Sequence, residues 1–300
     1  MKSAATILLG AALALAMFHF RPTAPAALPA AGDFYALSYS GGTPHIEVEI
    51  SGAPARAMLD YGATKSSLRA KTPAELGLIV KASTSLPFAG ESFFLTRRAD
   101  AGTDAILGTD LLAHLTITLE GTTATLSTSP ADATHLKADG YIPLDQRGFF
   151  SPDRRRVAND RPNVPVAFVS IGGVKTWAQI DTGYDDDLFP HSLDINQALY
   201  NELVAQGVPL TREGFVTIRT CAGYESRPVY SSPQKLMITD QTGAPVTETA
   251  RYSLIVKPAN PCGGIGARLG PAAQLGASFL RLFGAIVFDP QAERVWIKRN

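Results

Sequence analysis

Apolar and polar residues alternate in several short stretches of this 300-residue chain. Residues 45–50, with the sequence HIEVEI, and residues 115–119, with the sequence LTITL, change class at every step. A period of two is the pattern of a β-strand with one buried face, and frequent Gly and Pro residues between such stretches indicate tight turns. The pattern predicts an all-β fold with few helices. One helix is expected over residues 195–206, with Asp194 as its N-cap and Gly207 after its last turn.

One segment of the chain is repeated. The stretch from Ile50 to Asp60 corresponds to the stretch from Ile171 to Asp181, and each reads as a strand end, a turn and a second strand that ends in Asp. A stretch with partial or complete alternation precedes each copy, so each copy begins with a predicted hairpin. The two aspartates therefore occupy the same place in two copies of one structural unit.

A second motif recurs after each aspartate, in the same order. Residues 106–112, with the sequence ILGTDLL, precede one predicted strand, and residues 274–280, with the sequence QLGASFL, precede another. The second motif lies farther from its aspartate than the first does, so the second half has gained insertions. These repeats predict two homologous lobes of unequal size, at residues 32–127 and residues 164–300. Residues 128–163 lie between them with little periodicity, which is typical of a linker.

The N-terminal segment, residues 1–31, has a different composition. It carries a lysine at position 2, an apolar stretch and then a series of small residues. This is the pattern of a secretory signal peptide, and an uncleaved membrane anchor is the alternative because the apolar stretch approaches the length of a membrane span. Either interpretation places the remainder of the chain outside the cytoplasm, in the periplasm, at the cell surface or in the extracellular medium.

Charge and cysteine content narrow the range of partners. Lys plus Arg and Asp plus Glu both number 27, so no overall field attracts the protein to nucleic acid or to a membrane surface. We expect a monomer without a stable membrane partner, unless the N-terminal segment is an anchor. The only two cysteines, Cys221 and Cys262, are expected to form a disulfide in an oxidising compartment, and two buried free thiols are the alternative.

Asp60 and Asp181 are the candidate catalytic residues. A charged Asp at the end of an apolar strand is costly to bury, so it usually has a partner or a task. If the two lobes pack about a pseudo-twofold axis, the two carboxyl groups meet, share one proton and can activate a water molecule between them. The chain has no H-E-x-x-H or G-x-S-x-G motif, and residues 185–187 are interpreted as a solvated acidic turn. No metal and no cofactor are therefore expected.

The residues around the two aspartates resemble those of a known family. Residues 60–64, DYGAT, and residues 181–185, DTGYD, resemble the Asp-Thr/Ser-Gly signature of retropepsin-like and pepsin-like aspartic peptidases. The two Leu-Gly motifs resemble the hydrophobic-hydrophobic-Gly motif of that family. The resemblance implies duplicated six-stranded acid-protease barrel lobes with a peptide cleft between them. It also implies a hairpin flap over the cleft, for which residues 86–95 and 215–224 are the candidates.

The same resemblance implies an aspartic-type endopeptidase that acts on a peptide or protein substrate without a cofactor. Asp60 and Asp181 would be catalytic. The residues that support their loops would be Gly62, Thr64, Thr182 and Gly183. Thr182 can link the two loops through its hydroxyl group, whereas Tyr61 cannot make the equivalent contact with the same geometry. The alternative is therefore an inactive protein of the same fold that binds peptides in the periplasm.

Overall fold

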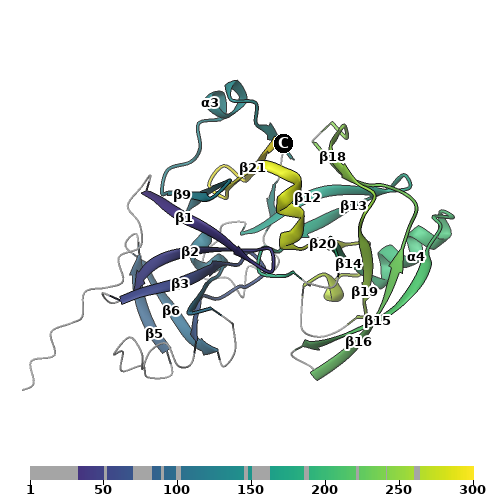
Figure 1. Ribbon diagram of the computed structural model, residues 1–300, viewed down its shortest axis with the longest axis horizontal. Coiled ribbons are helices and arrows are strands. Elements are labelled where there is room, and N and C mark those ends of the chain that lie inside the picture. The colour runs from purple at the N-terminus through teal and green to yellow at the C-terminus, as the bar shows by residue number, and fades with distance from the viewer. Residues whose placement is uncertain are drawn as a thin grey trace, which may run out of the picture.

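The computed structural model shows a mostly β protein of two lobes (Figure 1). Its strands form two sheets, one built mainly from the first half of the chain and the other from the second half. The helices in the part of the chain that the structure describes are short, in agreement with the sequence pattern. The structure describes residues 33–50, 53–69, 83–88, 91–98, 103–144, 148–150, 163–185, 189–220, 223–240, 242–259 and 264–300.

The first sheet runs in the order β10-β22-β21-β8-β9-β1-β2-β3-β7-β4-β6-β5. The strand predicted at residues 45–50 is confirmed as part of β2, and the strand predicted at residues 115–119 largely coincides with β8. The strands from the first half of the chain are β1 Asp33–Ser40, β2 Thr43–Ile50, β3 Ala53–Leu59, β4 Ser67–Arg69, β5 Ser83–Phe88, β6 Glu91–Arg98, β7 Ala105–Leu107, β8 Thr116–Glu120 and β9 Thr123–Ser127.

The second sheet runs in the order β15-β16-β19-β14-β20-β13-β12-β17-β18, with β11 paired to β12. Gly172 and Gly173 join β12 to β13 with φ values of 56° and 88°, a left-handed backbone that glycine adopts without strain. The strands are β11 Phe149–Phe150, β12 Val164–Ile171, β13 Val174–Ile180, β14 Ser192–Asn196, β15 Thr211–Thr220, β16 Gly223–Ser231, β17 Leu236–Thr239, β18 Pro245–Thr249, β19 Ser253–Lys257 and β20 Ala273–Leu275.

The helix predicted at residues 195–206 exists as α4 (Gln197–Ala205), but its predicted N-cap is wrong. Asn196 caps it instead, because its side-chain oxygen accepts a hydrogen bond from the Leu199 amide at 3.0 Å. Asp194 lies two residues earlier in β14, where a fully buried Ile195 continues the strand into the core. Burial of this strand prevails over the capping preference of Asp. Gly207, with φ 70°, follows the helix as predicted.

The same three strand pairings occur in both halves. A hairpin ends at each aspartate, formed by β2 and β3 before Asp60 and by β12 and β13 before Asp181. The last strand of each hairpin pairs in parallel with a short strand, β7 or β20, that carries the Leu-Gly motif. The next strand along the chain, β4 or β14, pairs antiparallel with that short strand. The two aspartates therefore lie at equivalent positions in equivalent strand arrangements.

The C-terminal strands belong to the sheet of the first half. β21 (Phe283–Asp289) pairs antiparallel with β8, and β22 (Arg294–Arg299) lies between β21 and β10 (Ile142–Pro143). The predicted linker also holds the helix α3 (Ala133–Ala138). Buried residues of β21, among them Ile286 and Phe288, contribute to the core. The two lobes are thus joined by shared sheet pairing as well as by the connecting segment.

Some predicted features lie outside the described residues. They include the signal peptide or anchor at residues 1–31 and both cysteines, Cys221 and Cys262. In the described ranges, no helix has the length and apolar character needed to cross a lipid bilayer.

Candidate active site

Asp60 directly follows β3 and is held by the backbone of its own loop. Its Oδ1 atom accepts hydrogen bonds from the Gly62 amide at 2.8 Å and the Ala63 amide at 2.9 Å. Its own amide donates to the Leu107 carbonyl of β7 at 3.0 Å. Two N–H donors on one carboxyl oxygen favour the ionised form of the group. The side chain is buried, and only 8% of the residue surface is exposed.

Asp181 directly follows β13 and repeats this arrangement. Its Oδ1 atom accepts a hydrogen bond from the Gly183 amide at 3.1 Å, and its amide donates to the Leu275 carbonyl of β20 at 2.9 Å. Part of the residue reaches solvent. The matched contacts show that the two halves build the same loop around their aspartates.

The glycines of the two Leu-Gly motifs allow these loops to pack closely. A β-carbon on Gly108 would lie 2.9 Å from the Ala63 carbonyl oxygen, and one on Gly276 would lie 2.8 Å from the Tyr184 carbonyl oxygen. The residue after each glycine forms a hydrogen bond across this short distance. The Thr109 amide donates to the Ala63 carbonyl, and the Ala277 amide donates to the Tyr184 carbonyl. The motif in each half therefore supports the aspartate loop of the same half.

Gly62 and Gly183 bring the two carboxyl groups together. A β-carbon on Gly62 would overlap the carboxyl group of Asp181, and a β-carbon on Gly183 would overlap the carboxyl group of Asp60. Each loop glycine therefore lies directly against the aspartate of the other half. Gly62 is exposed, so solvent reaches this meeting point. The carboxyl groups of Asp60 and Asp181 thus lie at one junction between the two loops.

Thr182 links the two loops, as the family resemblance implied. Its hydroxyl group donates a hydrogen bond to the Leu59 carbonyl at 2.5 Å and accepts one from the Tyr61 amide at 2.9 Å. The side chain is fully buried. Thr64, the other hydroxyl residue predicted to support the loops, is exposed.

Tyr61 takes a different role from its counterpart Thr182. Its ring is buried 4.4 Å from the ring of Phe288 and 6.3 Å from that of Phe149, measured between centroids. Among the described residues its hydroxyl group has no hydrogen-bond partner. Burial, and then the nearby Asp289, raise the pKa of Tyr61 well above its usual value. Aromatic packing therefore anchors the first loop where the second loop uses a hydroxyl group.

The surroundings of Asp181 favour its protonated form. Burial of the carboxyl raises the pKa of Asp181 well above its usual value, and the nearby charge of Asp60 raises it further. The Gly183 amide and Lys257 act in the opposite direction, whereas Asp194 adds to the rise. A carboxyl group beside a second carboxylate releases its proton less readily, so the charge of Asp60 favours a proton on Asp181.

Polar contacts near Asp181 were not predicted from the sequence. Gln274 donates a hydrogen bond from Nε2 to Asp181 Oδ2 at 2.8 Å. The buried Asp194 forms an ion pair with Arg227 at 2.9 Å, and Arg227 also contacts Glu225 at 2.6 Å. Gln274 and Asp194 each lie between two apolar residues of a strand, and a polar side chain in such a place usually has a partner when buried.

One candidate flap is a hairpin. β15 and β16 pair from Thr211 with Ser231 to Thr220 with Gly223, and this hairpin includes most of residues 215–224. Phe215 and Tyr224 on it are exposed. The other candidate, residues 86–95, coincides with parts of β5 and β6, which also pair as a hairpin.

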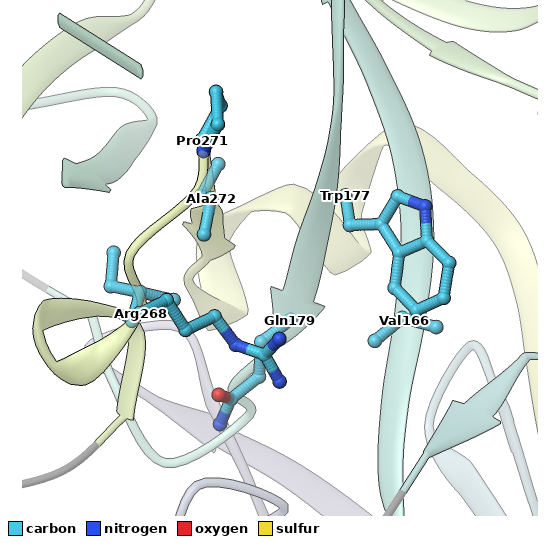
Figure 2. A pocket seen from close by; sticks show the side chains of 8 residues that line it. Val166, Trp177, Gln179, Arg268, Pro271 and Ala272 are labelled. Carbon is cyan, nitrogen blue, oxygen red and sulfur yellow. The ribbon is translucent and has the colours of Figure 1, made fainter. Parts of the chain in front are cut away.

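A cavity of about 320 Å³ opens beside β13 (Figure 2). Trp177 and Gln179 line it from one face of β13, because side chains alternate along the strand. In Figure 2 the Arg268 side chain extends toward Gln179. The lining residues, mostly apolar, are Val166, Trp177, Gln179, Ile265, Arg268, Pro271, Ala272 and Ala273.

The described residues contain no group of three or more His, Cys, Asp or Glu side chains placed to hold a metal ion. A scan against models of known protein families matched none of them to this chain, and a search of curated proteins found none similar to it.

Proposed function

We propose that the protein is an aspartic-type endopeptidase with two duplicated acid-protease lobes. It hydrolyses a peptide bond of the substrate with the carboxyl groups of Asp60 and Asp181. The observation that carries this proposal is the reciprocal packing of Gly62 and Gly183 against the two carboxyl groups. Because each glycine leaves room for the carboxyl group of the other half, the two carboxyl groups can approach each other and act as a pair. The matching strand pairings around both aspartates support the duplication.

The two aspartates take different roles in the proposed reaction. Asp60, with two N–H donors on Oδ1, is the ionised member and removes a proton from a water molecule held between the carboxyl groups. Asp181, whose pKa is raised, is the protonated member and donates a hydrogen bond to the carbonyl oxygen of the scissile bond. The water oxygen bonds to the carbonyl carbon as Asp181 passes its proton to the carbonyl oxygen, which gives a tetrahedral intermediate. The C–N bond then breaks, the proton held by Asp60 passes to the leaving amine, and Asp181 regains a proton from the intermediate.

The cavity beside β13 offers a place for a substrate side chain. Trp177 is 42% exposed, and its ring packs edge-on against Phe168 at 5.6 Å, so a rigid aromatic surface faces the cavity. Trp177 lies in β13, the strand that ends directly before Asp181, so we infer that a peptide bound at the carboxyl pair extends along β13 to it.

Trp177→Ala should raise KM for a peptide with a large apolar residue next to the cleaved bond by about tenfold, with kcat nearly unchanged. The reason is that the ring supplies apolar contact and takes no part in proton transfer. Steady-state kinetics on a peptide series will measure this. Phe34→Ala is the control, since Phe34 is an exposed aromatic residue of β1. Equal KM values for wild type and Trp177→Ala would show that the cavity does not bind substrate.

Tyr61 cannot make the loop contact that a Thr or Ser hydroxyl group makes at this position, and this motivates a second candidate function, a peptide-binding protein without catalysis. The decisive experiment is a cleavage assay of purified protein with fluorogenic peptides from pH 3 to pH 7, with and without pepstatin. Pepstatin-sensitive cleavage supports the peptidase. Binding of peptides without cleavage at any pH in this range supports the second candidate.

Tyr61→Phe should leave cleavage intact and raise the free energy of unfolding by about 1 kcal/mol, because it removes a buried hydroxyl group for which the described residues provide no partner. Tyr61→Thr should instead lower it by about 3–5 kcal/mol, since the ring packed on Phe288 leaves a cavity. Urea unfolding followed by circular dichroism will measure both. A clear loss of stability in Tyr61→Phe would mean that the hydroxyl group makes a stabilising contact.

A further inference from the structure

Gln274 distinguishes the two aspartates from each other. It lies in β20, where it pairs with Gln179 of β13. The equivalent residue of the first half is Ile106 of β7, which pairs with Met58 of β3. Ile106 has no polar group, whereas Gln274 Nε2 donates to Asp181 Oδ2 at 2.8 Å. Only the second half therefore places a side-chain donor from this motif on its aspartate.

The Gln274 side chain is well placed to hold the Asp181 carboxyl group still. Gln274 is buried, with 7% of its surface exposed, so water competes little for the hydrogen bond. The Gly183 amide donates to the other carboxyl oxygen, Oδ1. With one donor on each oxygen, rotation of the carboxyl group would break a hydrogen bond in a buried site. The orientation of Asp181 toward Asp60 is thus set by these two contacts.

Among the described residues, the charged groups that act on the Asp181 carboxyl group come from three other elements. Asp60 faces it from the first loop, Asp194 from β14 and Lys257 from β19. Asp194 is the register partner of Gln274, and its ion pair with Arg227 offsets its charge. Gln274 adds a neutral donor to this set, and such a donor favours the ionised carboxylate. This hydrogen bond therefore lowers the pKa of Asp181, whereas burial and the charge of Asp60 raise it.

We propose that Gln274 is a positioning residue that orients the Asp181 carboxyl group and sets the upper end of the pH range in which the Asp60–Asp181 pair keeps a single proton. The effect on ionisation follows from the contacts alone. The effect of Gln274 on the pH dependence of cleavage rests on the proposed peptidase function, because that reaction requires the pair to hold a single proton.

The test replaces Gln274 by Leu, which resembles the apolar residue of the first half and removes the donor. Without the donor, Asp181 should keep its proton to a pH about one unit higher. Carbon-13 NMR titration of the Asp carboxyl groups measures the pH at which Asp181 loses its proton. The resonances of the pair are assigned from those that disappear in Asp60→Asn and in Asp181→Asn. The basic limb of the kcat/KM profile should move upward by the same amount.

Two further variants make the test decisive. Ile106→Leu changes the equivalent site of the first half and should leave the titration of Asp181 unchanged. Gln274→Met keeps the unbranched shape of the side chain without its donor, so it replaces Gln274→Leu if that variant does not fold by circular dichroism. Both donor-free variants should show the same shift.

The outcomes separate the two proposals. An unchanged titration of Asp181 in a folded donor-free variant overturns the role of Gln274. A shifted titration with no cleavage by any of the proteins supports that role and counts against the peptidase. A shifted titration together with cleavage whose pH profile does not move overturns the link between Gln274 and the pH range of catalysis.

Discussion

Asp60→Asn and Asp181→Asn should each lower peptide cleavage by about 10³-fold or more while the protein stays folded. The proposed reaction needs one ionised and one protonated carboxyl group, and Asn supplies neither a base nor a transferable proton. The shape of the side chain is retained, so the Gly62 and Gly183 contacts persist. Cleavage of a fluorogenic peptide by wild type and both variants will measure the effect.

Thermal unfolding is the control for these variants, and it carries a prediction of its own. Folding raises the pKa of Asp181, so this group favours the folded state most strongly below its unfolded pKa of about 3.9. That contribution is lost as the pH rises toward the folded pKa. Asp181→Asn should therefore raise Tm relative to wild type at pH 7 by more than at pH 3.

Unchanged cleavage in both Asn variants would exclude the carboxyl pair as the catalyst.

Gly62→Ala and Gly183→Ala should each lower cleavage by about 10²-fold or more. The added β-carbon overlaps the carboxyl group of the aspartate in the other half, so that group must move. A displacement near 1 Å at reacting groups is enough for a loss of this size. Overpacking at this junction should also lower the free energy of unfolding by about 1–3 kcal/mol. Steady-state kinetics and urea unfolding will measure the two effects.

Gly270→Ala is the matched control, because a β-carbon at Gly270 would meet no atom within 4 Å. It should leave cleavage and stability close to those of wild type. If Gly62→Ala and Gly183→Ala behaved like this control, the two carboxyl groups would not depend on the close approach of the loops. That result would remove the observation on which the proposed function rests.

The packing of Tyr61 changes how its departure from the family pattern is interpreted. From the sequence alone, Tyr61 in place of the Thr or Ser of the family pattern implies that one hydroxyl contact between the loops is lost. In the structure, its ring contacts Phe288 of β21 and Phe149 of β11, so the first loop is anchored by apolar packing. The Thr182 hydroxyl group meanwhile contacts the backbone on both sides of Asp60. One hydroxyl group therefore connects the two loops, and one aromatic ring anchors the first loop to β21 and β11.

The sequence by itself determined the β class, the repeated hairpins and the equivalence of Asp60 with Asp181. These features depend on local patterns, namely alternation along a strand, glycine turns and the order of motifs, and such patterns are visible without three-dimensional contacts. They also located α4 to within two residues at its start. The boundary failed at Asp194 because the capping preference of Asp is weak compared with burial of a strand.

Only the tertiary structure decided which distant residues meet. The Gln274 contact to Asp181, the Arg227 pairing with Asp194 and the addition of β21 to the first sheet join positions far apart along the chain. A polar residue in an apolar strand shows that a partner is needed, but it does not show which one. The partner depends on how strands from both halves pack, since packing fixes the register that places each side chain on one face.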